Sequence, residues 1–171
     1  MDRFLNNPKH IQSYEILYLC HLLDKHNIII NIKADGIYKQ INYNNDSFES
    51  EQLNDFAYIF DILNYPKYLN SSYLNRVKFM NKQFNNINEI TIIKTYDEFI
   101  KEIKKDDMIY IEQKKDHTMI LKKSYLIKTS IEDFLKILEI NLDDVLCAFP
   151  TDGFIIILDE LLNFPFKYKP K

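Results

Sequence analysis

Glycine is scarce in this chain, and tryptophan is absent. The two glycines, Gly36 and Gly153, each directly follow an aspartate inside an apolar, strand-like segment. Asparagine is abundant and can occupy most turn positions that need a positive φ, so a glycine kept within a strand indicates a backbone that another group approaches closely. Asp-Gly is also the commonest short hairpin signal. We therefore interpret Asp35-Gly36 and Asp152-Gly153 either as site architecture or as hairpin turns.

Cysteine is equally rare. Cys20 and Cys147 lie far apart and share no metal-type spacing, which predicts free thiols in a reducing compartment. Cys20 together with His21 and His26 lacks the paired ligands of a zinc site, so we assign these three side chains to the core or to solvent.

Long apolar runs and an excess of basic residues are also missing. The longest unbroken apolar run, 154–158, is far too short to span a bilayer, and the first residues lack the apolar region of a signal peptide. The net charge of -3 excludes a general nucleic-acid binder, so any site for a polyanion must be local. We expect a soluble intracellular protein that does not contact a membrane.

The residues that are present are sufficient for a single domain, because the chain has 171 residues and 46% of them are hydrophobic. Hydrophobic periodicity and turn signals predict the elements in chain order. Helices are expected at 7–26, 69–84, 95–105 and 129–140, and strands at 27–43 (broken at Asp35-Gly36), 47–53, 56–63, 89–94, 108–113, 118–127, 146–149, 153–158 and 166–170. Hairpins interrupted by helices, without regular βαβ alternation, favour an α+β fold with mixed or antiparallel sheets and flanking helices.

Three of the helices have a recognisable start. Asn7 followed by Pro8 is a typical N-cap and first helical residue. Capping boxes open the helices at Thr95 and at Thr129. The helix at 69–84 is predicted to bury Tyr73, Val77 and Met80 on one side, with Arg76 and Lys78 away from that side.

Charged residues lie in segments that otherwise look like buried strands. Asp61 is the only charge in 56–63, and an isolated buried carboxylate costs several kcal/mol, so it must be paired, hydrogen-bonded or functional. The other charges of this kind are Lys33, Asp35, Glu49, Glu51, Asp152, Lys167 and Lys169.

Five short motifs in order resemble those of the covalent nucleotidyltransferases, the superfamily of mRNA capping guanylyltransferases and of DNA and RNA ligases. Lys33-Ala34-Asp35-Gly36 matches the Lys-x-Asp-Gly signature of that superfamily. Residues 48–53 resemble its third motif, which identifies the motif's glutamate as Glu51. The remaining motifs are similar to 58–63, whose aromatic residue Phe60 would stack on the base, to 151–156 and to 166–170. The resemblance covers the chain from residue 33 to its end.

Two details are closer to capping enzymes than to ligases: Asp-Gly at 152–153 and Lys-Tyr-Lys-Pro at 167–170. The resemblance therefore implies an mRNA guanylyltransferase of a compact, viral type, acting in the cytoplasm, a viral factory or a virion. It would form a covalent lysyl-GMP intermediate from GTP and transfer GMP to an RNA 5′ diphosphate end. The alternatives are the adenylation domain of an ATP-dependent RNA or DNA ligase, and a degenerate nucleotide-binding or scaffolding subunit.

The resemblance also implies a role for each site residue. Lys33 would be the nucleophile. Lys167 and Lys169 would hold the α-phosphate and favour the neutral amine of Lys33 by charge repulsion. Asp35, Glu51 and Asp152 would contact ribose or metal, and the two last-named would hold Mg²⁺ or Mn²⁺. The nucleotide site would also include Gly36, Phe60 and Gly153.

Each role has an alternative in ordinary protein structure. The two lysines near the end of the sequence, Lys167 and Lys169, are of a kind that commonly serves solubility. Glu49 shares a strand face with Glu51, but its own role is solvation in the simplest interpretation. Phe60 is as readily explained as a core residue. Arg76 matches an arginine that often follows the base-stacking strand, and a surface salt bridge would explain it equally well.

The chain departs from the superfamily pattern in three ways. Lys33 and Glu51 are only 18 positions apart. Tyr38 stands where many relatives have arginine. The sequence stops at Lys171, so the OB-fold domain and the sixth motif, which aligns the pyrophosphate leaving group, are not in it. We expect a single nucleotidyltransferase domain, 1–171, whose full activity needs a second chain or a missing domain.

Overall fold

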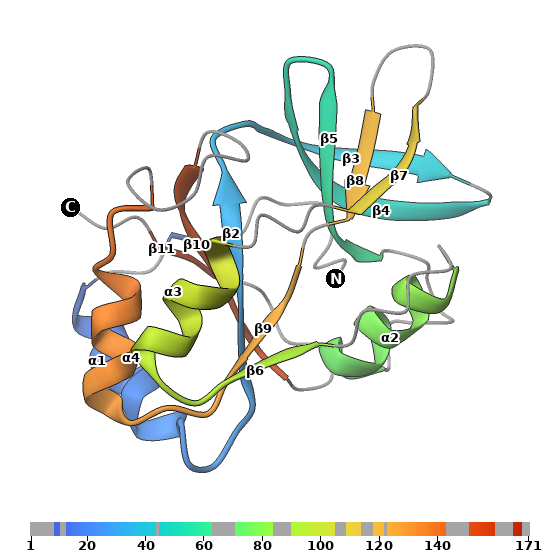
Figure 1. Cartoon of the computed structure of the whole chain (residues 1–171). Helices are drawn as coiled ribbons and strands as arrows, with labels where there is room; N and C mark the ends of the chain where they lie inside the picture. Colours follow the sequence, from blue (N-terminus) through green and yellow to red (C-terminus); the bar gives the residue numbers. More distant parts are fainter. Residues whose placement is uncertain are drawn as a thin grey trace.

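The computed structural model describes residues 9–10, 13–43, 45–62, 71–83, 90–104, 109–113, 118–121, 123–142, 151–159 and 166–168. Over these residues the chain is α+β, with one six-stranded sheet, one five-stranded sheet and four helices (Figure 1). Both sheets mix parallel and antiparallel pairs. The predicted α+β class with mixed sheets is therefore confirmed.

The larger sheet, called here the central sheet, has the strand order β1-β11-β10-β2-β9-β6. Its strands are β1 (Lys9–His10), β2 (Ile28–Ala34), β6 (Thr91–Ile93), β9 (Tyr125–Ile127), β10 (Thr151–Leu158) and β11 (Phe166–Tyr168). β2 pairs antiparallel with both β10 and β9, so it lies inside the sheet. All seven of its residues are buried.

The smaller sheet, called here the second sheet, has the order β3-β4-β5-β8-β7. Its strands are β3 (Ile37–Tyr43), β4 (Asp46–Leu53), β5 (Phe56–Ile62), β7 (Ile109–Gln113) and β8 (Thr118–Leu121). In Figure 1 the chain leaves the top of β2 and passes directly into β3, so the two sheets are continuous in sequence at this point.

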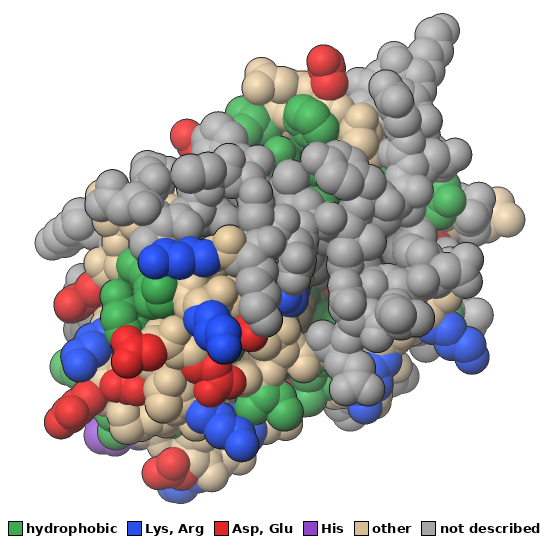
Figure 2. Space-filling view, viewed as in Figure 1, with side chains coloured by type: hydrophobic (Ala, Val, Ile, Leu, Met, Phe, Trp, Pro, Cys, Tyr) green, Lys and Arg blue, Asp and Glu red, His purple; other side chains and the backbone are tan. Residues whose placement is uncertain are grey.

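The helices are α1 (Ser13–Leu22), α2 (Tyr73–Gln83), α3 (Tyr96–Lys104) and α4 (Ile131–Leu138). Helices α1, α3 and α4 gather on one side of the central sheet, and α2 lies beside the second sheet (Figure 1). Over α3 and α4, Figure 2 shows acidic and basic side chains interspersed. This is the pattern of a solvated face, in keeping with the small net charge.

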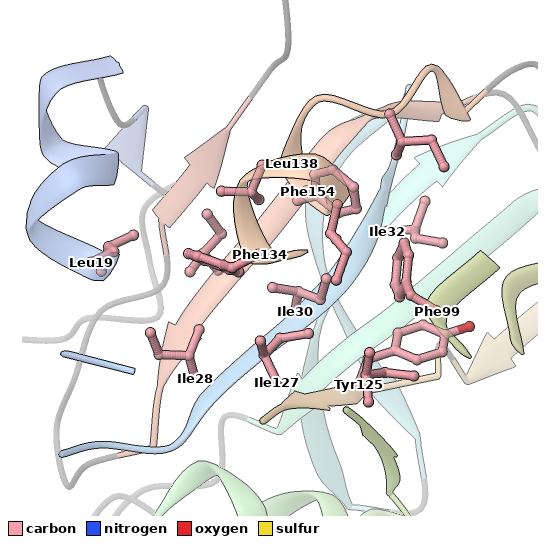
Figure 3. Packing of buried hydrophobic residues seen from close by; sticks show 14 of the residues in the cluster. Leu19, Ile28, Ile30, Ile32, Phe99, Tyr125, Ile127, Phe134, Leu138 and Phe154 are labelled. Atoms are coloured by element: carbon pink, nitrogen blue, oxygen red, sulfur yellow. The ribbon is translucent and has the colours of Figure 1, made fainter. Parts of the chain in front are cut away.

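The two faces of β2 belong to different cores, because side chains alternate along a strand. Ile28, Ile30 and Ile32 pack in one cluster with residues of α1, α3 and α4 (Figure 3). Ile29 belongs instead to a second cluster that includes residues of β5 and α2. Lys33 follows Ile29 at even spacing, so it projects from the side of β2 that faces the second sheet.

Most predicted strands and helices are confirmed within a few residues, including the break of 27–43 at Asp35-Gly36. Tyr73, Val77 and Met80 are buried on α2 as expected. The Thr95 cap is confirmed, because Glu98 N donates a hydrogen bond to Thr95 Oγ1 at 3.1 Å. The predicted strand 146–149 lies outside the described residues.

Three predictions about element boundaries are wrong. Residues 9–10 form a strand paired with β11, so the first helix begins at Ser13 rather than at 7–8. The predicted strand 118–127 is two strands, β8 and β9, in different sheets. The N-cap of α4 is Ser130 rather than Thr129, since Asp133 N donates to Ser130 Oγ at 3.2 Å. In the first two cases strand pairing with distant residues determined the element. In the third case the hydroxyl of Ser130, one position after Thr129, forms the cap.

Candidate active site

Lys33 lies at the meeting point of three distant parts of the chain. Its Nζ is 3.3 Å from Asp152 Oδ2 and 3.4 Å from Glu51 Oε2. It also donates a hydrogen bond to Ala34 O at 3.3 Å. Lys33 is only 9% exposed, and Glu51 is 3% exposed. Three residues that the motif resemblance assigns to the site therefore lie together in the structure.

The Glu51 carboxylate connects the two sheets at this point. One of its oxygens, Oε2, contacts the amine of Lys33, and the other, Oε1, accepts a hydrogen bond from Ala34 N at 3.3 Å. The carboxylate belongs to β4 of the second sheet, whereas both of its contacts belong to β2 of the central sheet. The position of the amine therefore depends on how the two sheets are held together.

The structure shows why each of the two Asp-Gly steps requires a glycine. A Cβ on Gly36 would lie 2.5 Å from Gln52 O, so only glycine lets the β2–β3 crossover pass the backbone of β4. Gly153 has a φ of 88°, which an L side chain rarely adopts, and the β10–β2 register shifts between Thr151 and Phe154. Such a bulge re-aims a neighbouring side chain, here Asp152 next to Lys33.

Neither Asp-Gly step is a hairpin turn. Asp35-Gly36 joins β2 of the central sheet to β3 of the second sheet, and Asp152-Gly153 lies inside β10. The site interpretation of the glycines therefore agrees with the structure better than the turn interpretation does. Asp35 itself is exposed on the crossover, outside the group formed by Lys33, Glu51 and Asp152.

Two tyrosines that the sequence reasoning did not assign to the site flank Glu51. Tyr38 on β3 and Tyr58 on β5 are the residues directly opposite Glu51 in the second sheet. Tyr38 is half-buried and donates a hydrogen bond to Glu49 Oε1 at 2.8 Å. The sequence signal that could have identified these tyrosines is the position of Glu51 on β4. Residues opposite a site residue on adjacent strands lie on the same face of the sheet.

Phe60 is placed in the core rather than at the surface of the site. It is 1% exposed and belongs to the cluster that also contains Ile59, Val77 and Met80. Its ring centroid lies 6.4 Å from that of Tyr38, which has the more accessible ring. The core alternative for Phe60 is therefore the one that the geometry favours.

Asp61 is paired, as its burial required. Arg76 on α2 contacts it with Nε at 2.9 Å and Nη2 at 3.2 Å, and both residues are 1% exposed. The surface salt bridge considered for Arg76 is therefore wrong, and Arg76 lies on the buried side of the helix. Burial alone lowers the pKa of Arg76, but the charge and hydrogen bonds of Asp61 outweigh it and the pKa is raised.

The predicted lysines of the last motif are only partly described. The backbone of Lys167 pairs with Ile155 on β10, which in turn pairs with Asn31 on β2. Lys169 lies outside the described residues. Register alone thus sets Lys167 two strands away from β2 in the central sheet.

Glu51 and Asp152 also form the candidate donor set for a divalent cation. In the part of the chain that the structure describes, no group of three or more His, Cys, Asp or Glu residues is arranged to hold a metal. Two carboxylates nevertheless fit Mg²⁺, which is commonly bound through one or two protein carboxylates together with water and substrate phosphates. These two carboxylates therefore provide oxygen ligands of the type that Mg²⁺ prefers.

No helix among the described residues is long and apolar enough to cross a membrane. No family model matches this chain, and no curated protein matches it either.

Proposed function

We propose that the chain is a nucleotidyltransferase domain in which Lys33 is the nucleophile, and that its reaction is guanylyl transfer to RNA 5′ ends. The observation that carries the proposal is the convergence of Lys33, Glu51 and Asp152. Three side chains from β2, β4 and β10 meet at 3.3–3.4 Å in a largely buried position, at the places that the motifs single out. The lysine amine is one of the nucleophiles that enzymes use in covalent catalysis.

The first step is attack of the neutral Lys33 amine on the α-phosphorus of GTP. A bond forms between Nζ and phosphorus, the bond to the β-phosphate oxygen breaks, pyrophosphate leaves, and the nitrogen loses a proton. Attack requires an acceptor for the proton that leaves Nζ. The oxygens of Glu51 and Asp152 are within hydrogen-bond reach of Nζ and are suitable acceptors.

The remaining residues bind and neutralise the phosphates. Lys167 and Lys169 are proposed to contact the α-phosphate and to offset the charge that grows in the transition state. Mg²⁺ or Mn²⁺ held by Glu51 and Asp152 would supply further charge neutralisation of the triphosphate. Asp35 and Gly36 would border the ribose. Gly153 would allow the backbone of β10 to pass close to the ribose.

The second step returns the enzyme to its starting state. The terminal oxygen of an RNA 5′ diphosphate attacks the phosphorus of lysyl-GMP, the N–P bond breaks, and the amine regains a proton. Guanylyl rather than adenylyl transfer is proposed because Asp152-Gly153 and the sequence at 167–170 are closer to capping enzymes than to ligases. The choice between GTP and ATP is an outcome of the experiment below.

The test is a labelling experiment with the full chain. The protein is incubated with α-labelled GTP or ATP and Mg²⁺ or Mn²⁺, then denatured. We expect a label from GTP that survives denaturation and alkali and is released by acid, as an N–P bond requires. Lys33→Arg keeps the positive charge between Glu51 and Asp152 but supplies no amine nucleophile, so it should abolish the label.

Lys39→Arg is the matched control, because Lys39 is an exposed lysine on the adjoining strand β3 and should leave labelling unchanged. Label from ATP alone would replace guanylyl transfer by adenylyl transfer and a ligase function. A complete lack of label with either nucleotide, or label that persists in Lys33→Arg, would overturn the proposal.

A further inference from the structure

Strand β5 contains a bulge close to the site. Glu51 lies opposite Tyr58, but Glu49 lies opposite Asp61, so Phe60 is the extra residue on β5. The bulge determines which side chains of β5 lie on the same face of the second sheet as Glu49. Because side chains alternate, a regular strand would place Phe60 opposite Glu49 and turn Asp61 to the other face.

The backbone carbonyl of this bulge is bound by a side chain from α2. Tyr73 Oη donates a hydrogen bond to Phe60 O at 2.6 Å. Tyr73 is fully buried, and its hydroxyl also accepts a hydrogen bond from Asn31 Nδ2 at 3.1 Å. Asn31 in turn accepts from Ser124 Oγ at 3.5 Å. These hydrogen bonds form a series from Ser124 through Asn31 and Tyr73 to Phe60, and Ser124 Oγ also lies 3.4 Å from Tyr73 Oη directly.

This series joins the same two sheets that the site joins. Asn31 is two residues before Lys33 on the same face of β2, and Ser124 directly precedes β9 of the central sheet. Phe60 belongs to β5, which pairs with the strand that carries Glu51. The Tyr73 hydroxyl therefore connects β2 to the β5 bulge through Asn31, two residues before Lys33.

We infer that Tyr73 is a positioning residue: its hydroxyl, held between Asn31 and the Phe60 carbonyl, sets the distance and direction from the Lys33 amine to Glu51. The inference rests on the proposed function insofar as it concerns catalysis. Its physical basis is that a shift of a fraction of an ångström between the two sheets moves the amine away from in-line geometry, whereas contacts to the nucleotide are largely retained.

The experiment uses Tyr73→Phe in the full chain, which removes only the hydroxyl. At saturating nucleotide the rate of adduct formation should fall about tenfold, equivalent to ~1.4 kcal/mol of activation free energy. The nucleotide concentration that gives half the maximal rate should change by less than about twofold, because the lost interaction acts on attack rather than on binding. Ser124→Ala, which removes the hydroxyl that contacts both Asn31 and Tyr73, should act in the same direction with a smaller effect and serves if Tyr73→Phe does not fold.

A second readout does not depend on activity. The rate at which acetic anhydride acetylates Lys33, followed by peptide mass spectrometry, should rise severalfold in Tyr73→Phe because the enclosed amine becomes more accessible. The control is Ile137→Val on α4, a buried residue in the cluster on the opposite face of the central sheet. It lowers stability without touching the series and should leave both readouts unchanged.

The outcomes separate the two proposals. If the wild-type chain forms no adduct, the proposed function fails, and Lys33 acetylation alone decides the positioning role. If adduct forms and both Tyr73→Phe and Ser124→Ala match Ile137→Val in rate and acetylation, the positioning role is overturned and the proposed function stands.

Discussion

At the scale of single residues, the most demanding feature is the buried ion pair of Asp61 and Arg76. Both charged side chains are buried away from water. The attraction between them compensates for the lost hydration only because the contact is bidentate. Removing one partner leaves the other as an uncompensated buried charge. Replacing both by apolar side chains removes the attraction and the desolvation cost together.

We therefore expect Asp61→Leu and Arg76→Met each to lower the free energy of unfolding by about 3–5 kcal/mol, whereas the double variant Asp61→Leu/Arg76→Met should lose much less. Urea unfolding of the two single variants and the double variant, analysed as a double-mutant cycle, measures this. Additive losses in the cycle would show that the two side chains are not coupled.

Tyr73 gives a pH dependence of stability. Burial, followed by the charge of Asp61, raises the pKa of Tyr73 above its ordinary value of 10.0. Above that value the unfolded chain releases the phenol proton while the folded chain keeps it. The stabilising contribution of Tyr73 is thus complete below pH 10 and is lost as the pH rises from there toward the folded pKa.

Between about pH 10 and pH 11, the wild-type chain should lose about 1 kcal/mol more of its unfolding free energy than Tyr73→Phe does, because the unfolded phenol is already half ionised at the start of this range. Other groups that titrate in this range are common to both proteins and cancel in the difference. Denaturant unfolding across the range measures it, and parallel pH profiles for the two proteins would contradict the expectation.

Asp61 and Phe60 illustrate what can and cannot be predicted from the sequence for single residues. A lone aspartate in an apolar strand was enough to predict that Asp61 is paired, hydrogen-bonded or functional, because burial of a charge is so costly; the structure shows that it is paired. That Arg76 is the partner of Asp61 was not predictable, because the packing of α2 against β5 is determined by the tertiary structure. The role of Phe60 was also undetermined, because a bulge, invisible in the sequence, decides which way its neighbours point.

At the scale of elements, the β2–β3 crossover depends on the absence of a side chain at Gly36. In Gly36→Ala the new Cβ would meet the backbone oxygen of Gln52, which cannot rotate away as a side chain can. We expect a loss of about 1–3 kcal/mol in unfolding free energy, the usual cost of overpacking. Adduct formation should fall as well, because the displaced strand β4 carries Glu51.

Asp35→Ala provides the control for stability in that experiment. It changes the adjacent, exposed residue and should alter the unfolding free energy by no more than about 0.5 kcal/mol. Chemical denaturation of the two variants decides the matter. Equal stability of Gly36→Ala and wild type would mean that the crossover can move away from β4 without cost.

Individual elements were predictable to different degrees for physical reasons. Strands β2 to β5 have strong apolar or alternating patterns bounded by turn residues, so their limits were nearly correct. In the segment 118–127 the polar residues at 122–124 separate two apolar stretches, but nothing local indicates that these stretches belong to different sheets. The edge strand β1 has only two residues and exists through pairing with β11, which lies more than 150 positions away.

At the scale of the whole molecule, the proposed nucleophile is attached to the most enclosed strand. β2 has a neighbour on each side and carries helices on one face and the second sheet on the other. The strand that follows it, β3, is an edge strand with mostly exposed or half-buried residues. The sequence indicated both strands but not this contrast, which arises from sheet order.

The contrast predicts a steep gradient of local stability across the Asp35-Gly36 crossover. Backbone amides of β2 should exchange with solvent only through global unfolding, with a free energy in the range of about 5–15 kcal/mol and a full dependence on denaturant. Amides on the outer side of β3 should exchange through local opening, with little dependence on denaturant. Native-state hydrogen exchange measured at several low denaturant concentrations tests this. Exchange of β2 through local opening would mean that Lys33 is not held rigidly, and a site that requires in-line attack would then lack the fixed nucleophile that the proposal assumes.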